Sequence, residues 1–209
     1  MTTKPQKKNI WQDHYTRQAK KEQYPARSVF KLQEIQEKLN ILKPGQRVLD
    51  LGCSPGSWLL YAAKVVGEKG RVFGIDLKPV TEKLPSNAEA HVGDIFDEAA
   101  AYWARIGTGF HMVMSDMAPN TTGDTTVDAA RSFRLCEAAM EVAARHLVPG
   151  GTFVCKIFQG EDFETMVAAV KHRFGKHKIF KPQSCRKASK EIYIIGTDLK
   201  KEASRNVGS

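Results

Sequence analysis

The chain has 209 residues and a hydrophobic fraction of 42%, which suits one well-filled core and is short for two domains. Its 32 Lys and Arg residues outnumber its 23 Asp and Glu residues, for a formal net charge of +9, so nucleic acid is favoured as a partner over an anionic membrane surface. The sequence has no run of about 18 apolar residues, and its N-terminus lacks the apolar stretch of a secretion signal, so a membrane-spanning protein is excluded and we expect a cytoplasmic one.

The two ends of the chain are polar. Residues 1–23 are basic, with Trp11 and Tyr15 as their only aromatic residues, and they predict a flexible N-terminal arm. This arm is either a solvated tail or a segment whose aromatic rings stack on bases. Residues 199–209 predict a disordered C-terminal tail, which leaves residues 24–198 as the single folded domain.

Helix-like and strand-like segments alternate through this domain. The predicted order is helix 26–42, strand 47–52, helix 57–67, strands 70–77 and 89–95, helix 98–107, strand 110–117, helix 129–147, strand 151–158, helix 162–174, and strands 176–182 and 191–198. Such alternation predicts an α/β fold with a largely parallel sheet and helices on both faces. The last two strands have no helix between them, so we expect an antiparallel pair at one edge. Ligands of such sheets bind beyond the carboxyl ends of the strands.

The first strand runs into a turn that carries glycines. In "VLDLGCSPGSW" (residues 48–58), Gly52 and Gly56 permit backbone shapes and a close ligand approach that a side chain would prevent. Their G-x-x-x-G spacing differs from the G-x-G-x-x-G of dinucleotide sites. A nicotinamide or flavin dinucleotide is therefore disfavoured.

Carboxylates follow the next two strands. Asp76 ends the strand after the glycine turn, where an acidic residue accepts hydrogen bonds from ribose hydroxyls, and Asp94 follows the third strand, where it could meet an adenine amine. Each alone is more typical of a helix cap or a turn. Their order along successive strand ends strengthens the signal and indicates a nucleoside without phosphates, which fits S-adenosylmethionine better than NAD.

Four ionisable residues stand where structure alone does not require them. Lys31 lies in the first predicted helix, Asp116 ends the fourth strand, Lys156 interrupts the fifth strand, and Glu191 opens the last one. Taken alone, Lys31 is typical of a solvated helix lysine, Asp116 of a turn cap, and Glu191 of a strand end. Lys156 is different, because a lysine in a buried strand must be paired or neutral.

These residues predict a proton-transfer site. Asp116 and Glu191 could hold Lys156 in place, while the charge of Lys31 and partial burial favour the neutral, proton-accepting form of Lys156. A lysine arranged in this way can act as a general base. Its expected target is a hydroxyl group, because a hydroxyl oxygen is a poor nucleophile until it loses its proton.

Cysteine and histidine spacing indicates neither disulfides nor zinc. Cys53, Cys136, Cys155 and Cys185 form no C-x-x-C pair, and the six histidines show no ligand spacing. We therefore expect no bound metal.

Four motifs together resemble one family. "DLGCSPGSW", "SDMAPNTTGDTTVDAARS", "GGTFVCKIFQGEDF" and "SKEIYIIG" are similar to the FtsJ/RrmJ ribose 2′-O-methyltransferases, and the resemblance runs from about Tyr24 to Gly196. It implies a Rossmann-like, class I S-adenosylmethionine-dependent methyltransferase fold. The family's Lys-Asp-Lys-Glu tetrad carries over onto Lys31, Asp116, Lys156 and Glu191. Its cofactor positions carry over onto Gly56, Trp58, Asp76, Asp94 and Asp116.

The resemblance also implies a substrate. "SDMAPNTTG" followed by Asp128 and Arg131 is similar to the bacterial branch that methylates a uridine ribose in the A loop of large-subunit (23S) ribosomal RNA. The chain departs from the commoner Ala-Ala-Pro-Gly-Gly at Cys53 and Ser57, which add side chains near the methionine end of the cofactor. We expect a monomer that acts on ribosomal RNA within the large subunit.

Other functions remain open at this point. Transfer RNA and a messenger cap also present a ribose 2′-hydroxyl. A non-catalytic ribosome-assembly factor could share the scaffold, although it would predict an eroded tetrad or glycine turn. Methylation of a base amine predicts an Asn/Asp-Pro-Pro-aromatic turn, which "DMAPN" does not supply.

Overall fold

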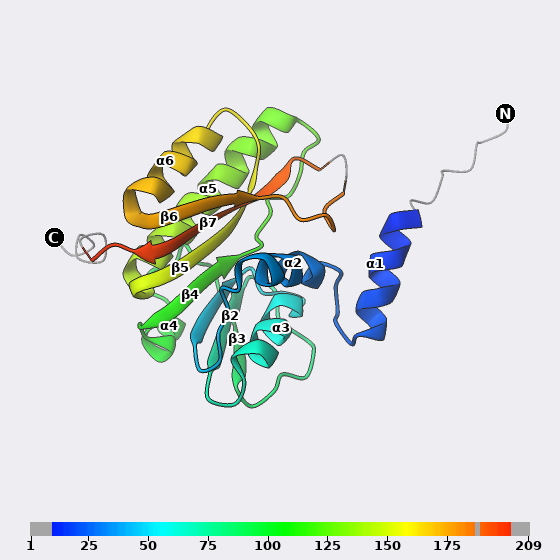
Figure 1. Ribbon diagram of the computed structural model, residues 1–209, viewed down its shortest axis with the longest axis vertical. Coiled ribbons are helices and arrows are strands. Elements are labelled where there is room, and N and C mark those ends of the chain that lie inside the picture. Colours follow the sequence, from blue (N-terminus) through cyan, green and yellow to red (C-terminus); the bar gives the residue numbers. More distant parts are fainter. Residues whose placement is uncertain (1–9, 187–188, 202–209) are drawn as a thin grey trace.

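One seven-stranded sheet runs through the computed structural model, which describes residues 10–186 and 189–201 (Figure 1). Its strand order is β3-β2-β1-β4-β5-β7-β6. The strands are β1 (Arg47–Leu51), β2 (Arg71–Asp76), β3 (Ala88–Val92), β4 (Phe110–Ser115), β5 (Leu147–Phe158), β6 (Phe174–Phe180) and β7 (Glu191–Leu199). The helices are α1 (Ile10–Lys21), α2 (Val29–Leu39), α3 (Ser57–Val66), α4 (Ala101–Ile106), α5 (Thr125–His146) and α6 (Phe163–Arg173).

The strand directions confirm the predicted sheet. Strands β3, β2, β1, β4 and β5 pair in parallel. Strand β7 runs antiparallel to both β5 and β6, and β6 is the outermost strand on that side. The chain winds outward from β1 to β3 and then returns to the other side of β1 with β4. This reversal of strand order opens a crevice at the carboxyl ends of β1 and β4.

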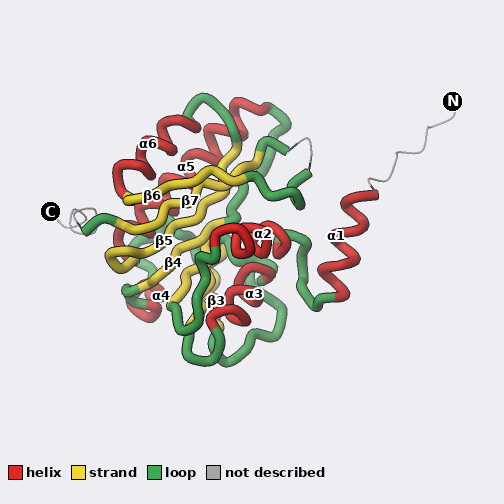
Figure 2. Tube along the Cα trace, in the orientation of Figure 1, coloured by secondary structure: helices red, strands yellow, loops and turns green. Residues whose placement is uncertain are grey.

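Helices cover both faces of the sheet, as predicted (Figure 2). One core lies under α4, α5 and α6 and includes the fully buried Phe110 and Phe153. The other lies under α2 and α3 and includes Leu32, Leu59 and Met112. Because successive side chains of a strand point to opposite faces, the central strands supply both cores. None of the described helices combines the length and the apolar composition that a membrane span requires.

Helix α1 is the main difference from the sequence-based prediction, which gave a flexible arm over residues 1–23. The helix packs on the start of α2, where Ala19 is buried with Val29 and Phe30. The rings of Tyr15 and Phe30 lie 5.3 Å apart. Tyr15 and Ala19 are four residues apart and share a helix face. The apolar face of α1 has only about one residue per helical turn. The many polar and basic residues around it therefore hide the helical pattern in the sequence.

The remaining parts of both predicted ends lie outside the described residues. These parts are residues 1–9 of the arm and residues 202–209 of the tail. Leu199, the first residue of the predicted tail, is buried and ends β7.

Candidate active site

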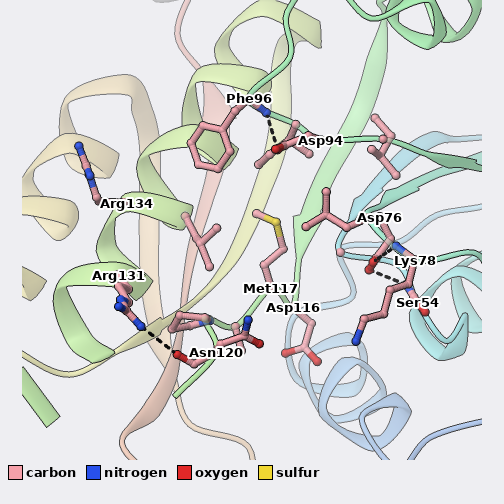
Figure 3. A pocket seen from close by; sticks show the side chains of 18 of the residues that line it. Ser54, Asp76, Lys78, Asp94, Phe96, Asp116, Met117, Asn120, Arg131 and Arg134 are labelled. Atoms are coloured by element: carbon pink, nitrogen blue, oxygen red, sulfur yellow. Dashed lines mark hydrogen bonds between the residues drawn. The ribbon is translucent and has the colours of Figure 1, made fainter. Parts of the chain in front are cut away.

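A cavity of about 840 Å³ lies at the carboxyl ends of β1 to β4 (Figure 3). Segments that follow these four strands line it, and Arg131 and Arg134 of α5 form part of its wall. Its volume lies within the range of about 300–1,000 Å³ that is usual for small-molecule sites. The crevice predicted by the sheet topology is therefore a site of the size of a nucleoside cofactor.

The glycine turn forms one wall of this cavity. Gly52 has a φ of 79° and Gly56 a φ of 115°, both in the left-handed region. A Cβ atom added to Gly52 would lie 2.4 Å from Cγ of Met117, so no side chain fits there. Gly52 lines the cavity, whereas Gly56, the residue before α3, does not.

The two predicted nucleoside carboxylates both line the cavity. Asp76 accepts hydrogen bonds from the N–H of Ser54 at 2.9 Å and from the N–H of Lys78 at 2.8 Å, one on each oxygen. Asp94 accepts from the N–H of Phe96 at 3.1 Å. A carboxylate oxygen can accept more than one hydrogen bond, so these bonds orient both groups and leave acceptor capacity for a ligand.

Trp58 is a second predicted cofactor residue, after Gly56, that lies outside the cavity lining. Its side chain is buried, it does not line the cavity, and its ring stacks on Tyr193 with centroids 5.7 Å apart. The indole N–H donates to the carbonyl of Ser28 at 2.8 Å. Trp58 therefore connects α3 both to β7 and to Ser28, the residue before α2.

Ser57 makes a second connection of the same kind. Its hydroxyl accepts from the N–H of Ala26 at 2.8 Å and lies 3.0 Å from the carbonyl of Ala26, to which it can donate. Ser57 is buried and is one of the two departures from the family's usual turn. The glycine turn and the start of α2 are thus held together by Ser57 and Trp58.

The four predicted reacting residues meet at the end of β5. The ammonium of Lys156, 6% exposed, lies 3.0 Å from Oδ1 of Asp116 and donates to the carbonyl of Asp116. The ammonium of Lys31 lies 2.9 Å from Oε1 of Glu191 and 3.8 Å from Oδ1 of Asp116. Asp116 also lines the cavity. The buried lysine in β5 is therefore paired, and its partner belongs to the cavity wall.

The charges in this cluster support one another. Burial alone would raise the pKa of Asp116, but the charges of Lys156 and Lys31 outweigh it and hold that pKa below its usual value. Burial likewise opposes the charge of Glu191, whose pKa is lowered mainly by Lys31. Burial would lower the pKa of Lys31, but Asp116 and Glu191 raise it. Both carboxylates and Lys31 are therefore charged at neutral pH.

Tyr193 belongs to this cluster, although the sequence did not single it out. Its hydroxyl donates to Oδ1 of Asp116 at 2.5 Å. Burial and the nearby carboxylates raise its pKa well above the usual value, so it keeps its proton. The available signal was its spacing, because Tyr193 follows Glu191 by two residues and lies opposite Lys156 in the β5–β7 register.

Asp128 holds the loop between β4 and α5. Its carboxylate accepts from the N–H and the hydroxyl of Thr122 at 2.8 and 3.0 Å, and from the N–H of Gly123 at 3.3 Å. The hydrogen bond from the Thr122 backbone is the main reason that the pKa of Asp128 is lowered. Arg131 donates to the carbonyl of Asn120 at 3.3 Å. The loop that contributes Met117 and Asn120 to the cavity is therefore attached to α5.

Asp50 is a fully buried acid. It lies in β1, two residues before Gly52, and neither carboxyl oxygen has a hydrogen-bond partner among the described residues. Burial, followed by the charges of Asp116 and Asp76, raises its pKa well above the usual value. Asp50 is therefore favoured as a neutral acid in the folded protein.

We expect Asp50→Asn to stabilise the protein at neutral pH. Because the folded state raises the pKa of Asp50, the wild type loses stability as the pH rises from about 4, the pKa of an unfolded Asp. Asparagine removes this loss. Near pH 4 the ionisation of Asp50 should cause no difference in melting temperature between the wild type and Asp50→Asn. At pH 7 the melting temperature of Asp50→Asn should be higher than that of the wild type, by about 2–4 °C for each kcal/mol of stability regained. A lower melting temperature at pH 7 would show that the ionised carboxylate is needed.

Within residues 10–186 and 189–201, no three His, Cys, Asp or Glu side chains are grouped so that they could hold a metal ion.

Comparisons with known proteins identify the family of the chain. Residues 24–199 match the FtsJ-like methyltransferase family. The chain is 59% identical over 198 residues to ribosomal RNA large subunit methyltransferase E of Desulforapulum autotrophicum, covering 95% of this chain and 97% of the relative. It is 53% identical over 210 residues to the protein of the same name from Desulfosudis oleivorans, and all of both chains is covered.

Solved structures share the fold. A crystal structure of a protein described as a ribosomal RNA methyltransferase, from Plasmodium falciparum, superposes with a TM-score of 0.72 at 25% identity. The match covers 84% of this chain and 98% of that one.

Proposed function

The chain belongs to the FtsJ-like methyltransferase family, and on that premise we propose that it transfers a methyl group from S-adenosyl-L-methionine to a ribose 2′-hydroxyl of RNA. The substrate in this proposal is a uridine of the A loop of 23S ribosomal RNA in the large ribosomal subunit. The names of the relatives support a ribosomal RNA substrate. The observation that carries the reaction type is the position of Asp116, which both lines the cavity and pairs with Lys156.

The residues that line the cavity fit this cofactor. Asp76 and Asp94 offer oriented acceptors for ribose hydroxyls and an adenine amine. Leu77 and Phe96 also line the cavity, and they are 69% and 58% exposed. Large apolar side chains left exposed beside a cavity are suited to cover a flat aromatic ring. Gly52 permits close approach of a ligand to the backbone.

The tetrad is suited to act on the acceptor hydroxyl. S-adenosylmethionine, when bound, supplies a methyl group on a sulfonium that is already an activated leaving group. Lys156 in its neutral form takes the proton of the 2′-hydroxyl, and the ammonium that results is stabilised by Asp116 at 3.0 Å. Lys31 and Glu191, paired at 2.9 Å, supply a donor and an acceptor that orient the ribose. Positioning by such fixed groups contributes to the rate together with proton transfer.

This proposal is tested by mapping methyl groups in RNA. The purified protein is incubated with S-adenosylmethionine and, separately, with large ribosomal subunits, naked 23S RNA and transfer RNA, each from cells that lack this gene. We expect one new 2′-O-methyl uridine, in the A loop, and none with Lys156→Ala. Methylation of a base, or of transfer RNA only, would contradict the proposal.

A further inference from the structure

Helix α1 has a fixed place beside the tetrad. Ala19 and Tyr15 pack against Val29 and Phe30 at the start of α2, and Lys31 is the next residue. The chain after α1 is held as well, since the N–H of Tyr24 donates to the carbonyl of Ala19 at 2.8 Å. Figure 1 shows α1 beyond α2, on the side of the molecule where β5 ends and β7 begins. Helix α1 therefore packs on the part of α2 that directly precedes Lys31.

The last turn of α1 presents basic side chains to solvent. Lys20 and Lys21 are exposed, and neither ammonium has a carboxylate partner among the described residues. Lysines at a helix C-terminus also interact favourably with the helix dipole. That role would make them stabilise the helix, and it would not require them to face a ligand.

A second basic segment lies near the tetrad. Residues 181–186 and 189–190 connect β6 to β7 and include the exposed Lys181 and Lys190, the latter next to Glu191. Glu34 of α2 fixes this segment by accepting from the N–H groups of Gln183 and Ser184 at 2.6 and 2.8 Å. Phe30, which contacts α1, and Glu34 both lie within three residues of Lys31. Two basic elements are thus attached to α2 within one helical turn of Lys31.

We propose that α1 is a docked phosphate-binding element, whose Lys20 and Lys21 contact the RNA backbone beside the nucleotide that is methylated. This inference rests on the proposed function, because it takes the ligand of the tetrad to be RNA. Two exposed ammonium groups match the charge of a phosphate backbone. Because α1 is already packed on α2, RNA binding requires no ordering of this helix, which would otherwise weaken binding.

The test compares two double variants that lose the same charge. Lys20→Gln/Lys21→Gln alters α1, whereas Lys43→Gln/Lys69→Gln alters exposed lysines that precede β1 and β2, at the amino ends of the strands and away from the tetrad. Point substitutions are cleaner than removal of α1, which would expose Val29 and Phe30. The probe is a hairpin RNA with the A-loop sequence, and its Kd is measured from 50 to 300 mM salt.

We expect the Lys20→Gln/Lys21→Gln variant to lower the log–log salt slope by about 1.4, because each phosphate of a single strand that a lysine neutralises contributes about 0.7. The Lys43→Gln/Lys69→Gln variant should keep the wild-type slope, and both should keep the wild-type affinity for S-adenosylmethionine. An unchanged slope in the first variant, or an equal decrease in both, would overturn the inference. Methylation of the hairpin by the wild type is measured in parallel. If the wild type does not methylate RNA, the proposed function fails. A salt slope that depends on Lys20 and Lys21 would still support the contact between α1 and RNA.

Discussion

Lys156→Arg is expected to reduce single-turnover methylation by about 10²–10⁴-fold, the usual contribution of a general base, while the variant still binds S-adenosylmethionine. Arginine keeps the positive charge that pairs with Asp116 at 3.0 Å, but it cannot lose its proton in a protein. A lysine that only pairs with Asp116 or orients the ribose should be partly replaceable by arginine. The measurement uses both substrates at saturation, and a melting curve confirms the fold.

Two comparisons separate proton transfer from charge. Lys156→Ala should be about as inactive as Lys156→Arg. Lys31→Arg should keep more activity than Lys156→Arg. Lys31 is a charged partner of Glu191 at 2.9 Å, and in the proposed reaction it does not accept a proton, so arginine can replace its charge. The wild-type rate should rise with pH, since only neutral lysine accepts a proton. Near-normal turnover of Lys156→Arg would leave positioning as the role of Lys156.

Asp76→Ala is expected to weaken S-adenosylmethionine binding by about 10- to 150-fold, equivalent to about 1.5–3 kcal/mol for hydrogen bonds to a charged group. The carboxylate is oriented by Ser54 and Lys78, so its loss also releases the glycine turn. Asp97→Ala is the matched control, because Asp97 accepts from the N–H of Ala99 in a similar turn and does not line the cavity. Titration calorimetry decides: equal affinities of the wild type and Asp76→Ala would remove Asp76 from the site.

The sheet was the most predictable part of the structure. Apolar strands that alternate with amphipathic helices form a parallel sheet, largely independently of the identity of single residues. The predicted order of helices and strands is confirmed from α2 to β7. Element ends were less predictable. Helix α5 begins at Thr125 and not at residue 129, because Asp124 accepts from the N–H groups of Thr126 and Val127. A capping hydrogen bond is a local event that apolar spacing does not report.

The site was predictable where a residue type conflicts with its surroundings. Lys156 in a buried strand is such a conflict, and the structure resolves it through Asp116. Tyr193 raised no conflict, because a tyrosine in a strand is typical of a core. For Trp58 the motif implied a cofactor role, and its packing adds contacts that a motif does not report, because the indole stacks on Tyr193 of β7 and its N–H donates to the carbonyl of Ser28.

The hydrogen bonds of Ser57 and Trp58 have a consequence for how the two substrates influence each other. They join the N-terminus of α3, which follows the glycine turn, to the backbone that leads into Lys31. A cofactor held at the turn and an RNA held at α2 would thus contact a single unit, with no need for the sheet to move between them. Such coupling is symmetric by thermodynamic linkage. If the cofactor changes the affinity for RNA by a given factor, RNA changes the affinity for the cofactor by the same factor. If both ligands bind as proposed, the contacts of Ser57 and Trp58 would be the physical basis for this reciprocity.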